Sequence, residues 1–162
     1  MLYPKVDSKV LGYLGRALSL ELTAVQQYLT CERLLMLRGF ESIAKKCRHE
    51  SKTEMEHVER IIGRMLVLGV APNASRLRPV VLGDSLPSLI SEIEKLESEI
   101  VNFYHQAVTH CQLVNDFDNR VFFARLLEEE QEHSGSLSSW SETVVTRPHR
   151  DAVSNEEPSN DR

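Results

Sequence analysis

Two Glu-x-x-His motifs are the part of this sequence best suited to chemistry. Glu54 and His57 form the first motif, and Glu130 and His133 form the second. Residues three apart lie on the same side of an α-helix, so each motif presents a carboxylate and an imidazole together. One such motif arises often by chance in a Glu-rich helix, so a single copy would indicate little.

A lone Glu precedes each motif by the same distance. Glu21 lies 33 positions before Glu54, and Glu97 lies 33 positions before Glu130. These four carboxylates interrupt apolar stripes, where a charge is costly unless a partner or a cation neutralises it. The alternative, ordinary solvent-exposed charges, does not account for two copies at equal spacing.

Two turn residues explain how these groups can meet. Gly39 lies 18 residues after Glu21 and 18 residues before His57, and Asn115 is centred in the same way between the second Glu and the second His. Antiparallel helices rise equally, so both groups of a hairpin reach one height, roughly 25 Å from the turn at 1.5 Å per residue. Two hairpins packed face to face would therefore bring four Glu and two His to one level.

Six such residues can bind two metal ions. Four neighbouring carboxylates repel one another and take up protons unless a metal neutralises them. Bridging by two of the carboxylates would give each ion enough ligands and leave positions open for oxygen. Mixed oxygen and imidazole ligands with open positions suit iron, which cycles between ferrous and ferric states. The predicted di-iron ligands are Glu21, Glu54, His57, Glu97, Glu130 and His133.

The elements that must hold these residues are four long helices. Apolar residues at spacings of three, four or seven predict helices over about 8–38, 40–68, 85–114 and 116–145. The connection over 70–84 has no clean period and suits a crossover along a bundle. We expect an all-α four-helix bundle over 1–145. The polar residues 146–162 contain no amphipathic segment and are expected to form a disordered tail.

Composition limits the other functions. The 162 residues are 27% charged and 41% hydrophobic, which suits one soluble domain with a sizeable core. A net charge of −5 disfavours nucleic acid and is compatible with handling cations. We expect a cytoplasmic protein without a membrane segment, because no stretch approaches ~18 apolar residues and no secretory signal is visible. The three Cys lack paired spacing, so they predict reduced thiols.

Residues 5 to 144 resemble the bacterioferritins of the ferritin-like di-iron family. Three runs carry the resemblance: ELTAVQQY from Glu21, HESKTEMEH from His49 and LEEEQEH from Leu127. The resemblance implies a ferritin-like bundle with a ferroxidase centre. Glu21, Glu54 and His57 would hold one iron. Glu97, Glu130 and His133 would hold the other, with Glu54 and Glu130 bridging.

The resemblance also implies a function and partners. Dioxygen or hydrogen peroxide would oxidise Fe(II) to Fe(III), and the ferric mineral would be stored in a hollow shell of 24 subunits. A ferredoxin-type protein would supply electrons for iron release. The family ends in a short fifth helix that lines the four-fold channels, and this sequence lacks one, so a related second subunit could be required.

Met55 points to a second cofactor. A helical Met is usually a packing residue, but Met55 lies about 100° round the helix from Glu54 and so faces away from the di-iron ligands. In bacterioferritins a Met at this position, one from each of two subunits, ligates a haem b. Arg48 and Lys52 share its face, where the family more often has apolar or aromatic residues. They would either pair with the haem propionates or mark a subunit that binds haem poorly.

Four other residues gain an expected role through the resemblance. Tyr28 matches a family tyrosine beside the centre, and His49 and Glu50 match positions that handle iron on the cavity side. Thr53 stands where an Asp is common, so that auxiliary site would be weakened; a solvated face is the alternative.

Cys31 and Cys47 lie eight residues either side of Gly39. They are either small buried residues or a pair that oxidants can bridge.

Two other functions stay open at this point. The first is a soluble di-iron peroxidase of the rubrerythrin type, although that family usually adds a Cys cluster or a further ligating Glu. The second is a haem-carrying or purely structural subunit of a mixed shell, which the six intact ligands disfavour.

Overall fold

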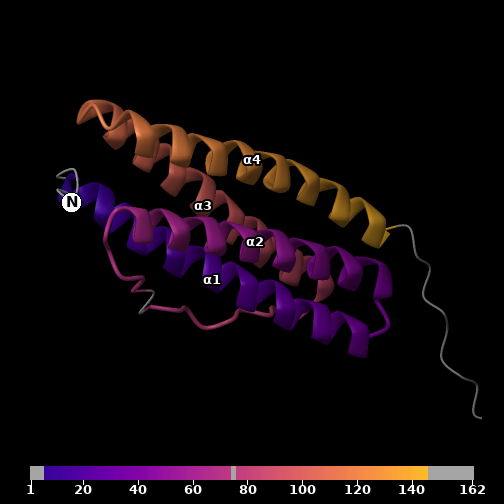
Figure 1. Ribbon diagram of the computed structural model, residues 1–162. Coiled ribbons are helices and arrows are strands. Elements are labelled where there is room, and N and C mark those ends of the chain that lie inside the picture. The colour runs from indigo at the N-terminus through magenta and orange to yellow at the C-terminus, as the bar shows by residue number, and fades with distance from the viewer. Residues whose placement is uncertain (1–5, 74–75, 146–162) are drawn as a thin grey trace, which may run out of the picture.

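Four helices make up nearly all of the described chain. The computed structural model describes residues 6–73 and 76–145. Its helices are α1 (Ser8–Leu37), α2 (Glu41–Val67), α3 (Leu86–Leu113) and α4 (Phe117–Val145). Helices α1 and α2 form one antiparallel hairpin, and α3 and α4 form the other (Figure 1). No strand occurs in these two described ranges, and the predicted all-α four-helix bundle is confirmed.

Side-chain caps fix two of the helix starts. The Asp7 carboxylate accepts hydrogen bonds from the backbone N–H groups of Lys9 and Val10 at 2.9 and 3.2 Å. The Ser85 hydroxyl accepts one from the backbone N–H of Ser88 at 3.2 Å. Both caps satisfy backbone donors that the first helical turn leaves free. Helices α1 and α3 therefore begin where the sequence predicts.

The two hairpin turns lie at the predicted residues. Gly39 has φ +78° and Asn115 has φ +56°, in the left-handed region that ends many helices. Asn adopts this conformation more readily than other residues with a side chain. Each hairpin therefore has arms of equal length from its turn to its Glu and its His.

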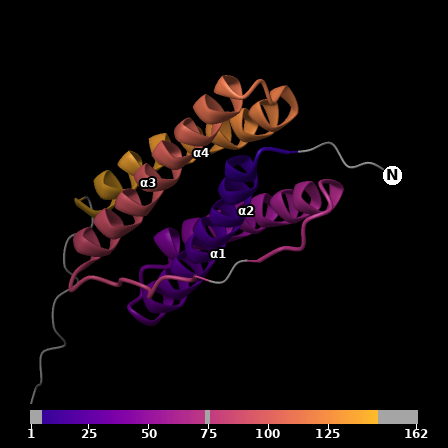
Figure 2. The ribbon, with the colours of Figure 1, turned by 90° about the vertical axis from the view of Figure 1, so that its left-hand side faces the viewer.

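The segment between α2 and α3 is a crossover that runs along α1 (Figure 2). The Gln27 side chain accepts a bond from the Val81 N–H at 3.0 Å and donates one to the Val81 carbonyl at 2.6 Å. Thr23 accepts a bond from the Arg78 N–H at 3.4 Å, and the Arg78 guanidinium binds both oxygens of Glu99 at 2.7 Å. These contacts tie the crossover to α1 and α3.

The interior is apolar except at one level. Its largest fully buried side chains are Tyr28, Tyr104, Phe123, Leu14, Leu18, Leu35, Ile61, Leu89, Ile93, Ile100, Leu126 and Leu137. The predicted tail over 146–162, and with it the expected lack of a fifth helix, lies outside the described residues. In the described part of the chain, no helix is long and apolar enough to span a membrane.

Candidate metal centre

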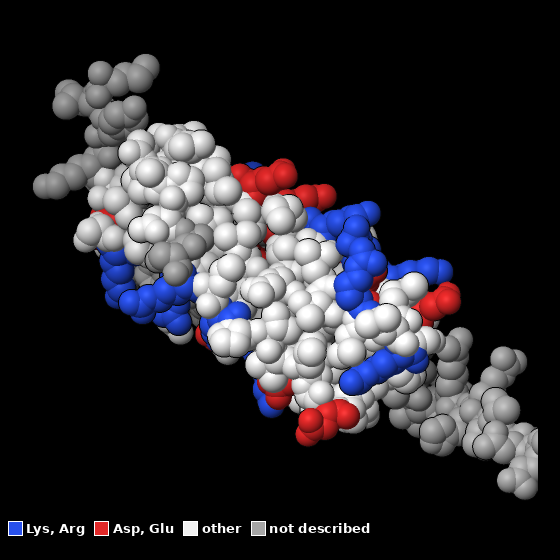
Figure 3. Space-filling view, turned by 90° about the horizontal axis from the view of Figure 1, so that it is seen from below, with Lys and Arg blue, Asp and Glu red and all other residues white. Residues whose placement is uncertain are grey.

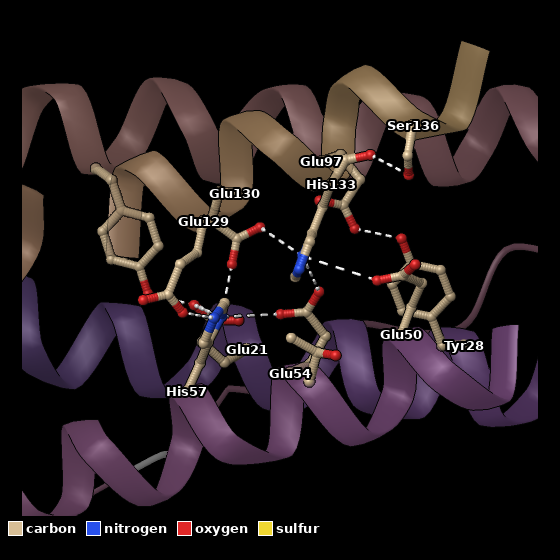
Figure 4. Close-up of polar contacts among 12 residues, drawn as sticks. Glu21, Tyr28, Glu50, Glu54, His57, Glu97, Glu129, Glu130, His133 and Ser136 are labelled. Carbon is tan, nitrogen blue, oxygen red and sulfur yellow. Dashed lines mark hydrogen bonds and ion pairs between the residues drawn. The ribbon is translucent and has the colours of Figure 1, made fainter. Parts of the chain in front are cut away.

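Four helices each contribute one fully buried carboxylate at the same level of the bundle. Glu21 comes from α1, Glu54 from α2, Glu97 from α3 and Glu130 from α4, and each is 0% exposed. The two His side chains project among them from α2 and α4 (Figure 4). The equal hairpin arms thus bring all six predicted residues together.

His57 lies at the centre of the first group. Its Nδ1 is 2.7 Å from Glu130 Oε1, 3.2 Å from Glu54 Oε2 and 3.6 Å from Glu21 Oε1. One atom from each of these four residues lies within 4.8 Å of the other three, close enough to hold one metal ion. All four side chains are buried, so an ion here would be shielded from water.

His133 lies at the centre of a second, more open group. Its Nδ1 is 3.4 Å from Glu54 Oε1, 3.8 Å from Glu50 Oε2 and 4.0 Å from Glu130 Oε2. The His133 side chain keeps 17% of its surface exposed. Glu54 belongs to both groups and Glu130 faces both His rings, as carboxylates that bridge two ions would.

The second group differs in one member from the sequence prediction. Glu97 was assigned to the His133 side, but its Oε1 accepts a 2.5 Å hydrogen bond from the Tyr28 hydroxyl. Glu50, one turn before Glu54, supplies the nearby oxygen instead. Glu97 still borders the centre because it lies against Glu130.

Two tyrosines tie the hairpins together crosswise. Tyr28 of α1 donates to Glu97 of α3, and Tyr104 of α3 donates to Glu21 of α1. Each tyrosine lies seven residues after the Glu of its own helix. Sequence analysis treated Tyr104 as a packing residue, although the internal repeat that relates Glu21 to Glu97 also relates the two tyrosines.

The buried ligand atoms lack other partners. Among the described residues, neither oxygen of Glu54 or Glu130 has a hydrogen-bond partner, nor does Oε2 of Glu21 or Glu97. The Nδ1 atoms of both His are equally without one. Buried polar atoms are rarely left unpaired because their desolvation is costly. Their convergence fits a pair of divalent cations, which would neutralise and coordinate them.

Burial and mutual repulsion change the protonation of the centre. Burial, reinforced by Glu21, raises the pKa of Glu54 far above its ordinary value and that of Glu130 to about 8. Burial and Glu130 raise the pKa of Glu97 in the same way. Without a cation these carboxyls therefore hold protons at neutral pH, and a cation would displace them.

His57 responds to its surroundings in the opposite sense. Burial by itself would lower its pKa, but the contacts with Glu130, Glu21 and Glu54 outweigh burial and raise the pKa. Its outer nitrogen, Nε2, lies 3.0 Å from Glu129 Oε2. Arg60 donates to both oxygens of Glu129 at 2.9 and 2.7 Å. Sequence analysis gave Glu129 and Arg60 no role, because no periodicity distinguishes them from solvent-exposed charges.

Comparison with known proteins identifies the family. Residues 11–144 match the family model described as the ferritin-like domain. The bacterioferritin of Rhodobacter capsulatus is 35% identical over 135 residues, which are 83% of this chain and 84% of the relative. That of Brucella melitensis is 33% identical with the same coverage, and that of Streptomyces coelicolor is 30% identical over 82% of this chain and 80% of the relative. The chain belongs to the bacterioferritin family. The resemblance stated from the sequence is thus confirmed.

Met55 of this bacterioferritin-family chain faces away from the metal centre. Its side chain is 39% exposed, whereas the adjacent Glu54 is fully buried. Arg48 and Lys52 are exposed as well. The predicted direction of Met55 is therefore observed, and the haem itself stays a prediction.

The remaining residues named from the sequence lie around the centre. His49 is exposed, and Thr53 is half-buried with its hydroxyl 3.4 Å from the His49 carbonyl. Cys31 and Cys47 are buried free thiols, and burial raises the pKa of Cys31 to about 11. Such thiols are weak nucleophiles, and an oxidative bridge between them stays a hypothesis.

Proposed function

We propose that this chain is an iron-storage subunit that oxidises Fe(II) to Fe(III) at the buried carboxylate and histidine centre. Either dioxygen or hydrogen peroxide would accept the electrons, and the ferric product would be stored as mineral in a hollow oligomeric shell. One observation carries this proposal. Unpaired oxygen and nitrogen atoms from four helices converge in an apolar interior, with one edge open at His133.

The ligands divide between two sites. Glu21 and His57 would bind one ion, Glu54 and Glu130 would bridge, and His133 would bind the other. Glu97 and Glu50 are the two candidates for the last carboxylate, since each has an oxygen close to the second site. Bound iron would supply one electron from each ion, and the carboxylates would balance the added positive charge by releasing their protons.

Oxidation of Fe(II) tests the site. Aerobic addition to the metal-free protein is expected to give a fast phase that ends at about two irons per subunit, as for other di-iron carboxylate bundles, and then slower mineral growth. Glu54→Ala and His133→Ala should abolish the fast phase. Glu56→Ala is the matched control because Glu56 is exposed on the same helix. An unchanged fast phase in Glu54→Ala would show that the assignment is wrong.

An apolar surface supports assembly with other subunits. The face formed by α1 and the crossover is largely uncharged, with Lys, Arg, Asp and Glu mostly around its margin (Figure 3). Leu29, Leu77 and Val81 are 36, 53 and 48% exposed. Exposed apolar side chains of this kind mark protein interfaces. The proposed partners are identical or related bacterioferritin subunits, in a shell of 24 that could contain two kinds of chain.

Native mass measurement of the iron-loaded protein tests this assembly. A closed shell that retains iron is the expected result. A small oligomer that turns over peroxide but never retains iron would instead favour the rubrerythrin-type activity. Ferredoxin-dependent iron release and a cytoplasmic location belong to the same proposal.

Haem binding is the finer part of the proposal. The exposed thioether of Met55 supports it, because a ligand shared between two subunits must lie at the surface. Arg48 and Lys52 are placed to pair with propionates. A Soret band in the purified protein, lost in Met55→Leu, is expected. A wild-type spectrum without a Soret band after haem is added would remove haem from the proposal.

A further inference from the structure

The two hairpins repeat one another with a constant offset of 76 residues. The offset relates Glu21 to Glu97, Tyr28 to Tyr104, Glu54 to Glu130 and His57 to His133. The geometry follows the repeat, because the two tyrosines bind the two lone Glu residues reciprocally. The two His rings also stack almost in parallel, with centroids 5.8 Å apart and 11° between planes. Equivalent positions in the two halves can therefore be compared directly.

In the first half, a charged pair fixes the imidazole from outside. Glu129 accepts two hydrogen bonds from Arg60 and lies 3.0 Å from His57 Nε2. A carboxylate bound in this way accepts, so Nε2 carries the proton and Nδ1 is left to face the buried carboxylates. A partner on the outer nitrogen fixes the orientation of the ring and raises its strength as a ligand.

In the second half, both members of this pair are replaced. The repeat equivalent of Glu129 is Thr53, and that of Arg60 is Ser136. Their hydroxyls bond to backbone carbonyls, Thr53 to His49 at 3.4 Å and Ser136 to His133 at 2.8 Å (Figure 4). Across the described ranges no side chain forms a hydrogen bond or ion pair with His133 Nε2.

The two rings differ in the way that this loss predicts. The nearest carboxylate oxygens lie 2.7 and 3.2 Å from His57 Nδ1, but 3.4 and 3.8 Å from His133 Nδ1. His57 keeps 1% of its side-chain surface exposed, whereas His133 keeps 17%. The second imidazole is thus less firmly held and closer to solvent.

We propose that Glu129 and Arg60 are positioning residues that make the His57 side the tighter metal site. Thr53 and Ser136 leave the His133 side weaker, so the two ions bind in a fixed order, His57 side first. This inference rests on the proposed two-metal centre and deepens it. Loss of an outer partner of a metal-bound His typically costs 10–100-fold in metal affinity, which sets the expected difference between the sites.

Titration with Co(II) under anaerobic conditions tests the order without any iron oxidation. Visible absorbance and calorimetry of the full-length metal-free protein are expected to show two steps with affinities at least about tenfold apart. His133→Ala should keep only the tight step, and His57→Ala only the weak one. Two steps of equal affinity in the unmodified protein would overturn the inference and leave the centre intact. No Co(II) binding at all would overturn the proposed centre as well.

Variants of the positioning residues provide a second readout. Glu129→Gln and Arg60→Ala should weaken the first step about tenfold, with Arg60→Lys restoring part of it. Thr53→Asp combined with Ser136→Arg rebuilds the missing pair and should strengthen the second step by a similar factor. Thr53→Ser with Ser136→Ala is the matched control and should change neither step. An unchanged second affinity in the rebuilt pair would count against the inference.

Discussion

Tyr104 of α3 donates a hydrogen bond to Glu21 of α1, so it connects the two hairpins at the level of the metal ligands. Tyr28 and Glu97 make the reciprocal connection from α1 to α3. Each bond fixes one oxygen of its carboxylate and leaves the other facing the centre. The carboxylates are therefore oriented by the protein before any metal arrives, which lowers the cost of ordering them on binding.

Removal of the Tyr104 hydroxyl should destabilise the metal-free protein. Tyr104→Phe leaves Glu21 Oε1 buried without its donor, which is expected to cost about 1–3 kcal/mol in the free energy of unfolding. Urea unfolding at a fixed subunit concentration measures this cost. Tyr13→Phe is the control, since the half-buried Tyr13 ring packs on Phe103 and keeps that contact. Equal stabilities of the two variants would contradict the importance of the cross-connection.

The metal-free protein should lose stability as the pH rises from about 4.5 to about 8. The pKa of Glu130 is raised from 4.5 to about 8, so in this window the folded state keeps a proton that the unfolded state has released. The stabilisation is complete below the unfolded pKa and is lost through the folded one. Glu54 and Glu97 act in the same sense.

Thermal unfolding at several pH values, with the metal removed by a chelator, measures this dependence. Glu130→Gln should flatten the profile, because its amide does not titrate. Co(II) should raise the melting temperature most at the alkaline end, where ligands bind without first losing protons. A melting temperature that increased with pH in the metal-free protein would contradict the assigned direction.

The attachment of the crossover should depend on Gln27. Gln27→Ala removes both side-chain bonds to Val81, so the free energy of unfolding is expected to fall by about 1–3 kcal/mol. Hydrogen exchange at the Val81 amide should become faster. Gln26→Ala, one residue earlier and exposed, is the matched control. Undiminished protection of the Val81 amide in Gln27→Ala would show that other contacts hold the crossover.

The turn at Asn115 should distinguish backbone conformation from side-chain chemistry. Asn115→Ala places an ordinary side chain at φ +56° and is expected to cost about 1 kcal/mol. Asn115→Gly should be tolerated, because Gly adopts this conformation freely. Chemical denaturation of both variants supplies the comparison. A Gly variant less stable than the Ala variant would mean that the Asn side chain itself holds the turn.

Sequence reasoning predicted what depends on local rules. Helix starts at Asp7 and Ser85, and turns at Gly39 and Asn115, follow from capping and from left-handed conformations, which are encoded in a few adjacent residues. The convergence of the six candidate ligands follows from spacing alone, because a helix rises by a fixed amount per residue.

What sequence reasoning missed depends on side chains that reach across helices. Glu129 and Arg60 look like solvated charges until the bundle places them beside His57. Glu50 replaces Glu97 in the second group because rotamers, and not spacing, decide which carboxylate turns inward. Haem at Met55 and closure of a shell depend on contacts between chains, which one chain does not contain.

The equal arms of each hairpin have a consequence for the evolution of this protein. One residue inserted into α1 between Glu21 and Gly39 would turn the Glu by about 100° and shift it by 1.5 Å relative to His57. Insertions and deletions within the helices are therefore excluded unless a second change compensates them. The crossover between α2 and α3 carries no ligand, so length changes in related chains should be concentrated there.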